Sequence, residues 1–538
     1  MTAVKSRGQP DYGSPMPDSV TRDMVLAAPA PVRALALGST ALSPVPGARD
    51  PKLAERIAAA IEADVLRAGW PVGMVIGSEG ELTGRYGVGR AVIREAVRLA
   101  EHRQVVRMRR GRGGGLVVVE PDVSAVTESL GIFLEYARAD VDDLIEARVV
   151  LEGFSAATAA SASVSASQIE ALRQLAHEVP DCADAPAHAR TRLIHELVAK
   201  ATGNAALSLF IRAIASLTEQ LTAGAAANRD SRRPPGQAVQ GHHLAIVEAI
   251  AASDGEQARD QAFADMAGLR ESIRDLLRQP RARDASPRAS PAGAAPAGFS
   301  PADAARTGIP PRPADLVAAR IRRDITDRGW PVGESLGFEA DLMQRYGIGR
   351  AQFREAIRIL ENHSVVRMQR GAAGGMLVAV PDGRAIVRAV SLYLTYQGMD
   401  ADDIRDLRAE LETATVRLTI DRLTDESIQR LTAVLELERT WPDDDFPAVS
   451  HDLHAVIAEL SGNRTLGLLQ SIAMQLTAER LHSGDPSRVT ESPDAVRRAH
   501  QAIVQAIIAR NAPLALRRME KHLRAIARWT VESSPSHR

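Results

Sequence analysis

The sequence has few of the residues that mark secreted, disulfide-rich or membrane proteins. Its 538 residues include one cysteine, 3% aromatic residues and no apolar run of membrane-spanning length. A single cysteine excludes an internal disulfide framework and fits a reducing compartment. Because aromatics are scarce, the cores must be built from Ala, Leu, Ile and Val. We therefore expect a cytoplasmic protein without a membrane span.

An internal repeat is the strongest feature of the chain. Residues 69–122 align without a gap to residues 329–382, at a constant offset of 260, and 30 of the 54 positions are identical. Weaker copies follow, such as "VDDLIEARVVLE" from Val141 and "ADDIRDLRAELE" from Ala401. A period of this length indicates duplication of a whole multi-domain unit rather than a solenoid.

The duplication and the composition divide the chain into six segments. Residues 1–48 and 280–309 are rich in Pro and Ala without periodicity, which predicts a disordered tail and a linker. We expect winged-helix DNA-binding domains at 49–122 and 310–382. All-α helical-bundle domains for effector binding and dimerisation are expected at 123–279 and 383–538. The fold class is thus mainly α, with a small β wing in each DNA-binding domain.

The winged helix is predicted from the order of elements in each copy. In the first, an amphipathic helix over 52–68 precedes a short helix over 79–86, where Ser78 and Glu81 form a capping box. A third helix over 90–102 leads into two β-branched runs around glycines at 111–115. Helix, helix, turn, helix and hairpin is the order of a winged helix-turn-helix.

The third helix and the hairpin are strongly basic. Nine arginines lie between Arg85 and Arg112 against two acids, and six lie in the equivalent stretch of the second copy. Arg90 and Arg94 are one helical turn apart and share a face. Guanidinium forks suit guanine edges and phosphates, and a glycine-rich tip lets the backbone approach DNA closely. This pattern favours double-stranded DNA as the partner over an ordinary solvated face.

In these motifs the chain resembles the GntR family, FadR subfamily, over about 50–279 and 310–530. The resemblance implies that arginines of the third helix and the wing contact DNA, with adjacent residues near the bases. The matching DNA-binding positions are Arg90, Ala91, Val92, Arg94, Gly111 and Arg112, then Arg350, Ala351, Gln352, Arg354 and Gly371. The chain departs from the family at Gly80 and Ala340, where an arginine is usual, and at Phe338, which replaces the Ser N-cap.

The same resemblance implies a divalent-metal site in each helical domain, built from an Asp, a His four residues later and two further histidines. For the second domain it implies His454, His500 and His522, which suit Zn²⁺ or Ni²⁺, with His451 nearby. The first domain retains His195 and His243, with Leu269 at the third position, which predicts a poor site. The Asp position holds Thr191 and Ser450. The alternative is that these histidines are ordinary core or surface residues.

An Arg–Glu pair one helical turn apart recurs in both copies, as Arg148 with Glu152 and Arg408 with Glu412. One interpretation is that Arg148 and Arg408 face an effector cavity and hold a carboxylate ligand. The other is a surface ion pair, worth only about 0.3–0.5 kcal/mol. The sequence leaves both open.

Together these features predict a transcriptional repressor, not an enzyme, that binds DNA and senses a small metabolite, such as a carboxylate. One alternative is a DNA-binding protein whose helical domains have decayed into dimerisation scaffolds. A metal-dependent hydrolase is a further alternative, although a nucleophile motif and a nucleotide loop are lacking. Two DNA-binding domains in one chain predict an intrachain pseudo-dimer, as opposed to a homodimer of fused chains. Because Val92 stands opposite Gln352, the operator should be an imperfect inverted repeat.

Overall fold

The computed structural model describes residues 53–109, 111, 114–177, 187–226, 237–278, 313–369, 371, 374–440, 446–482 and 492–531. The expected tail at 1–48, the expected linker at 280–309 and Arg112 lie outside these residues. Within them the mainly α fold class is confirmed, with two small antiparallel sheets as the only strands. No helix of this part is long and apolar enough to cross a bilayer.

The first copy begins with the first winged helix, which comprises α3 (Leu53–Arg67), β1 (Val75–Gly77), α4 (Glu79–Tyr86), α5 (Arg90–His102), β2 (Val106–Arg109) and β3 (Gly115–Val118). The helical domain that follows comprises α6 (Val123–Ala137), α7 (Val141–Ser161), α8 (Ala166–His177), α9 (Ala187–Ala201), α10 (Ala205–Ala226), α11 (Gln237–Ala251) and α12 (Gly255–Arg278). Strand β3 is central and pairs antiparallel with both β1 and β2.

The second copy repeats this order. The second winged helix comprises α14 (Pro313–Asp327), α15 (Glu339–Tyr346), α16 (Arg350–Asn362), β4 (Val366–Gln369) and β5 (Gly375–Val378). Its helical domain comprises α17 (Gly383–Tyr396), α18 (Ala401–Asp421), α19 (Asp425–Thr440), α20 (Phe446–Leu460), α21 (Arg464–His482), α22 (Pro493–Ile508) and α23 (Ala512–Val531). In place of a third strand, only a bridge between Ser335 and Leu377 remains.

Local sequence explains the helix-turn-helix geometry. Ser78 and Glu81 form the predicted capping box at the start of α4, whereas Phe338 caps α15 without a side-chain hydrogen bond. Gly87 and Gly347 end these helices with φ values of 64° and 65°, a left-handed conformation that glycine adopts without steric cost. The turn into each third helix is therefore set by one glycine.

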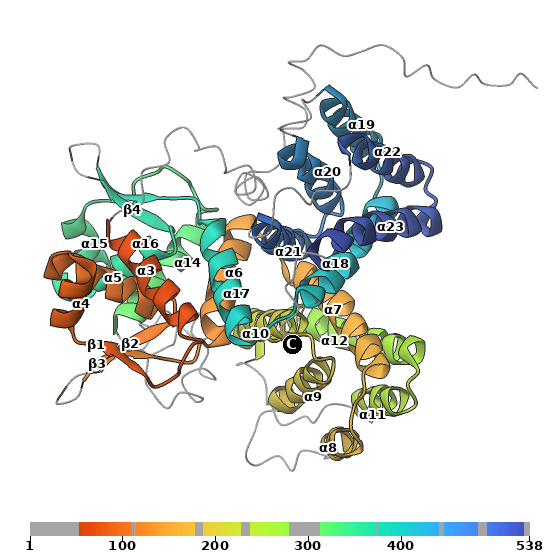
Figure 1. Ribbon diagram of the computed structural model, residues 1–538, viewed down its shortest axis with the longest axis horizontal. Helices are drawn as coiled ribbons and strands as arrows, with labels where there is room; N and C mark the ends of the chain where they lie inside the picture. Colours follow the sequence, from red (N-terminus) through yellow and green to blue (C-terminus); the bar gives the residue numbers. More distant parts are fainter. Residues whose placement is uncertain are drawn as a thin grey trace, which may run out of the picture.

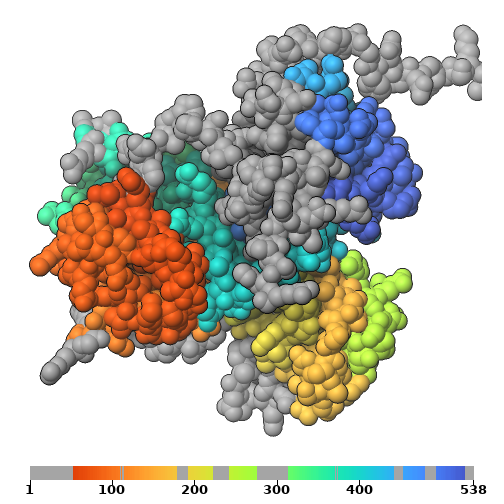
Figure 2. All heavy atoms as spheres, in the orientation of Figure 1, coloured from red at the N-terminus to blue at the C-terminus, as the bar shows by residue number. Residues whose placement is uncertain are grey.

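The two helical domains share a single apolar core. Helices α6, α7 and α10 of the first copy and α17, α18 and α21 of the second contribute to one buried cluster, which includes Leu130, Phe210, Val390 and Leu469. Within it, helices α6 and α17 run side by side (Figure 1). The outer helices of each copy then form two separate lobes, with α8, α9 and α11 in one and α19, α20 and α22 in the other (Figures 1 and 2). The copies are thus joined as a pseudo-dimer within one chain.

Each winged helix docks on the first helix of the other copy's helical domain. In the first, Trp70 packs against Tyr396 of α17, with the ring centroids 5.6 Å apart. In the second, Trp330 packs against Tyr136 of α6 at 5.7 Å. The arrangement is symmetric, because both members of the second pair lie 260 residues from their counterparts in the first. The docking is therefore crossed.

Two asparagines, which end the short sequences "TGN" at 202–204 and "SGN" at 461–463, reinforce the contact between copies. The Oδ1 atoms of Asn204 and Asn463 each accept the backbone N–H three residues on, at 2.8 Å, and so cap α10 and α21. Their Nδ2 groups donate across the pseudo-dimer to the carbonyls of Asp403 and Asp143, at 2.9 and 3.1 Å. One short motif thus starts a helix and joins the two copies.

Because the core is shared, we expect both copies to unfold in one transition. Replacing the fully buried Phe210 with alanine should lower the free energy of unfolding by about 3–5 kcal/mol, since the cavity opens between the copies. Urea denaturation followed by circular dichroism measures this. The matched control is Leu221→Ala on the same helix, where the side chain is 50% exposed and a change within about 0.5 kcal/mol is expected. Two separate transitions, one for each copy, would contradict a shared core.

Candidate DNA-contacting surface and histidine centres

The third helices, α5 and α16, separate an apolar face from a basic face. On α5 the buried face is Ile93, Ala96, Val97 and Ala100, and on α16 it is Phe353, Ala356, Ile357 and Leu360. Arg90, Arg94, Arg350 and Arg354 are all exposed on the opposite face. The packing of each winged helix therefore presents the predicted arginines to solvent.

Residues between these arginines differ between the two helices. Ala91, Ala351 and Gln352 are exposed, whereas Val92 is half-buried and packs against the core of its own winged helix. At the same helix position, one winged helix thus presents an amide and the other an apolar edge. The two surfaces are alike in shape and different in chemistry.

On each basic face, a glutamate that was not assigned from the sequence forms ion pairs with arginine. Glu79 accepts from Arg94 at 2.9 Å, and Glu339 lies 3.4 Å from Arg350 and 3.5 Å from Arg354. Both acids open the preceding helix and are 260 residues apart, a repetition that was visible in the sequence. These pairs orient guanidinium groups that are themselves 60–71% exposed.

The wing tips require glycine. Gly111 and Gly371 have φ values of 102° and 110°, which L side chains rarely adopt. Each carbonyl accepts the N–H of the glycine three residues later at 2.9 Å, which closes a tight turn. Arg112 and its counterpart Ala372 lie outside the described residues.

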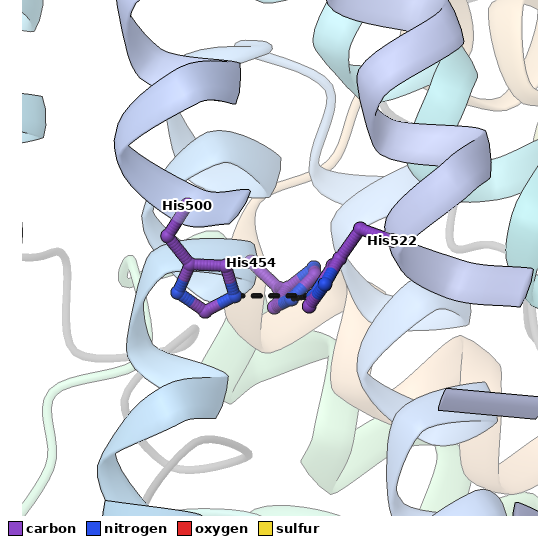
Figure 3. Close-up of side chains that lie close together, drawn as sticks. All are labelled: His454, His500 and His522. Carbon is purple, nitrogen blue, oxygen red and sulfur yellow. Dashed lines mark hydrogen bonds between the residues drawn. The ribbon is translucent and has the colours of Figure 1, made fainter. Parts of the chain in front are cut away.

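Three histidines of the second helical domain converge at one point. His454 from α20, His500 from α22 and His522 from α23 direct their rings toward one another, as Figure 3 shows. Nε2 of His522 lies 3.1 Å from Nε2 of His500 and 3.3 Å from Nε2 of His454. All three side chains are buried. The predicted set is therefore brought together.

Carboxylates lie behind two of these rings. Glu412 bonds to Nδ1 of His454, and both oxygens of Glu438 lie 2.9 Å from Nδ1 of His500. Burial raises the pKa of Glu438 to about 8 and lowers the pKa of His500 to about 4. Neutral imidazoles, oriented through Nδ1 by a carboxylate, are the form in which histidine ligates metals. Neither glutamate was predicted from the sequence as a member of the site.

This cluster of three histidines fits a divalent cation, because hydrogen bonds do not satisfy all of its ring nitrogens. Three Nε2 atoms share one small space, and two imidazole nitrogens about 3 Å apart can share at most one proton. The donor atoms of the three rings lie within 4.8 Å of one another, and Nδ1 of His522 is buried without a hydrogen-bond partner. Three imidazoles form an open site of the kind that Zn²⁺ occupies. The side chains of Ser450 and His451 are not described.

The first helical domain contains a related cluster, and here the sequence analysis was wrong about the third position. His195 and His243 face Asp265 of α12, whose Oδ2 lies 3.2 and 3.5 Å from their Nε2 atoms. Asp265 precedes His522 by 257 residues, the same offset that separates His243 from His500. Leu269, the residue expected there, lies one helical turn further on. Copy one therefore combines two imidazoles with a carboxylate.

The first cluster also has a carboxylate behind it and a small cavity beside its two histidines. Glu152 lies 3.2 Å from Nδ1 of His195. Although burial opposes charge there, Glu152 and Asp265 raise the pKa of His195 to about 9. A cavity of about 10 Å³, the space of a single water-sized sphere, is lined by Glu152, His195 and His243. The side chain of Thr191 is not described.

The repeated Arg–Glu pairs belong to these clusters. Arg148 and Arg408 are 6% and 4% exposed, so the interpretation as a surface ion pair is wrong. Arg408 donates to Glu412 at 2.5 Å, and Glu412 bonds in turn to His454. Nη2 of Arg408 and Nε of Arg148 have no hydrogen-bond partner. Each cluster thus includes a buried guanidinium with free donor capacity.

Family models match both copies. The model described as "Bacterial regulatory proteins, gntR family" matches residues 53–115 and 313–374, and that of the FCD domain matches 143–268 and 403–525. The chain is 26% identical over 226 residues to the HTH-type transcriptional repressor NanR of Cronobacter sakazakii, across 41% of this chain and 86% of that protein. For NanR of Enterobacter sp., identity is 28% across 40% and 84%. A solved structure, Streptococcus agalactiae GntR, is 22% identical across 40% of this chain and 99% of its own, with a TM-score of 0.31.

Removing Glu412 tests the buried Arg–Glu–His chain. In Glu412→Ala, Arg408 keeps its charge in a buried position without its partner, so the free energy of unfolding should fall by about 3–5 kcal/mol. Asp421→Ala, an exposed carboxylate on the same helix, is the control, with a change within about 0.5 kcal/mol. Equal stability of the two variants in urea denaturation would show that the Arg–Glu contact contributes nothing.

Proposed function

This chain belongs to the gntR family of bacterial regulatory proteins, with an FCD domain behind each winged helix, and on that premise we propose that one molecule acts as a complete transcriptional repressor. It occupies one operator with both of its winged helices. A small carboxylate metabolite, held in the FCD domains, releases it. Repression, as opposed to activation, is suggested by the NanR repressors that the chain resembles.

DNA binding rests on the two exposed arginine faces. Arg90 and Arg94 on α5, and Arg350 and Arg354 on α16, project from helices whose other face is buried, the geometry that places side chains in a major groove. Arg112 adds a wing contact to phosphate. Gln352 can bond to adenine N6 and N7, whereas Val92 offers only an apolar edge to a thymine methyl. The proposed operator is therefore an imperfect inverted repeat.

The single observation that carries this proposal is the core shared by the two helical domains. Family members present two winged helices through a dimer, and here one chain supplies both. The crossed docking of Trp70 on Tyr396 and of Trp330 on Tyr136 fixes the winged helices to that core. No second chain is needed to complete the DNA-contacting unit.

Stoichiometry on DNA tests this proposal. Light scattering of the complex with a minimal operator should give one 57.6-kDa chain per duplex. Arg350→Ala should weaken that complex by about 1–3 kcal/mol, because loss of a bidentate contact in one half-site is not replaced by another subunit. Arg328→Ala, outside the recognition helix of the same winged helix, serves as the control. Two chains per duplex would instead favour a dimer of fused chains.

The effector proposal rests on the buried arginines. Arg408 lies beside Glu412 and His454 and retains an unpartnered Nη2. This nitrogen can donate a hydrogen bond to one oxygen of a carboxylate. His454, His500 and His522 would hold a divalent metal, and His195, His243 and Asp265 would hold a second. When bound, such an ion supplies a Lewis-acidic position for a second carboxylate oxygen. Decayed effector domains are disfavoured, because both copies retain three convergent donors.

Metal content distinguishes the two clusters. Full-length protein loaded with Zn²⁺ and dialysed should retain two ions per chain by mass spectrometry of its metals. His522→Ala and Asp265→Ala should each lose one, since each removes one of three ligands, and His177→Ala, an exposed histidine, should lose none. The midpoint temperature of thermal unfolding should rise on loading with Zn²⁺. Full retention of metal by both ligand variants would refute these assignments.

A further inference from the structure

The interfaces that hold the winged helices carry opposite charges in the two copies. Beside Trp70 and Tyr396, the buried Glu62 of α3 pairs with Arg388 of α17, with Nε to Oε2 at 2.9 Å. Arg103 of the same winged helix also donates to Glu62, at 2.5 Å. Glu62 is only 2% exposed and sits between two guanidinium groups. An acid on the first winged helix thus meets a base on the helical domain.

In the second interface, the residues equivalent to Glu62 and Arg388 have the opposite charge, and the residue equivalent to Arg103 is a histidine. Residue 322, which is 260 positions after Glu62, is an arginine that pairs with Glu135 of α6 at 3.1 Å. Residue 128, the counterpart of Arg388, is a glutamate 3.6 Å from Nε2 of His363. His363 and Arg322 lower the pKa of Glu128, whose side chain is 46% exposed. Here a base on the winged helix meets acids on the helical domain.

The apolar contacts do not distinguish the two docking sites. Trp70 and Trp330 are identical, as are Tyr396 and Tyr136, and Leu392 is matched by Ile132. Helices α6 and α17 also lie side by side (Figure 1). These apolar side chains alone therefore give no preference for crossed docking.

We propose that the reversed pairs, Glu62–Arg388 and Arg322–Glu128/Glu135, assign each winged helix to the helical domain of the other copy. Docking of the first winged helix on α6 sets Glu62 against Glu128, and docking of the second on α17 sets Arg322 against Arg388. Like charges in a partly desolvated interface are strongly unfavourable. The same repulsion opposes pairing of equivalent copies from two chains, so the charges select the intrachain pseudo-dimer.

Charge reversal on the helical domain tests the first interface. Arg388→Glu leaves Glu62 paired with Arg103, so the winged helix stays folded while its docking is repelled. Amide exchange of α3 and of the Trp70 segment in the full-length chain should accelerate at least about tenfold. Adding Glu62→Arg and Arg103→His, which copies the residues of the second winged helix, should restore protection. Arg384→Glu, one turn away with a 69% exposed side chain, should have no effect.

Exchanging the charges of the two winged helices tests the assignment itself. Glu62→Arg, Arg103→His and Arg322→Glu together set a base against Arg388 and an acid against Glu128 and Glu135, so both crossed interfaces become like-charged. Without DNA, metal or effector, amide exchange of α3 and α14 in the full-length chain should then accelerate at least about tenfold. Adding Glu128→Arg, Glu135→Thr and Arg388→Glu, which exchanges the residues of α6 and α17 at these positions, should restore protection.

Several results would overturn this proposal. They are unchanged amide exchange in Arg388→Glu, no recovery in its rescue variant, unchanged amide exchange of α3 and α14 in the threefold variant, or no recovery in the sixfold variant. Because no DNA or ligand is present, these outcomes are independent of whether the chain represses transcription.

Discussion

The apolar core between the two helical domains is the contact on which the rest of the molecule depends. It aligns α6 with α17, and those helices are the platforms on which the winged helices sit. It also places α7 and α18, which carry the buried Arg–Glu pairs, against the opposite copy through Asn463 and Asn204. A core rich in Leu, Val, Ile and Phe thus positions both the exposed arginines of α5 and α16 and the histidine clusters.

Much of this organisation was predictable because the chain repeats itself. The elements of each winged helix, the glycine turns and the convergence of His454, His500 and His522 followed from local patterns and family resemblance. Asp265 was missed because the offset between the copies shifts from 260 to 257, and the third ligand was sought one helical turn away. The crossed docking could not be deduced, since an internal offset shows which residues are equivalent and not which copy they contact.

Glutamates illustrate a different limit of sequence reasoning. Glu412 and Glu438 act behind the histidines, from helices distant in sequence, and no spacing rule connects them to the rings they orient. The burial of Glu412 also changes the interpretation of the Arg–Glu pair. On a surface such a pair contributes little to stability, whereas in the interior it fixes a charge beside the histidine cluster. Only packing distinguishes these cases. At the two docking interfaces, apolar positions have kept their character while the charged positions have changed.

Joining the two copies in one polypeptide changes how operator occupancy depends on the level of gene expression. A homodimeric regulator must first associate, so at low abundance its competent form falls with the square of the chain concentration. Here the core forms between segments that are always at high effective concentration, so under the proposed function no association step precedes DNA binding. Operator occupancy should therefore scale linearly with the number of molecules in the cell. A few copies per cell then give a graded response in place of a threshold.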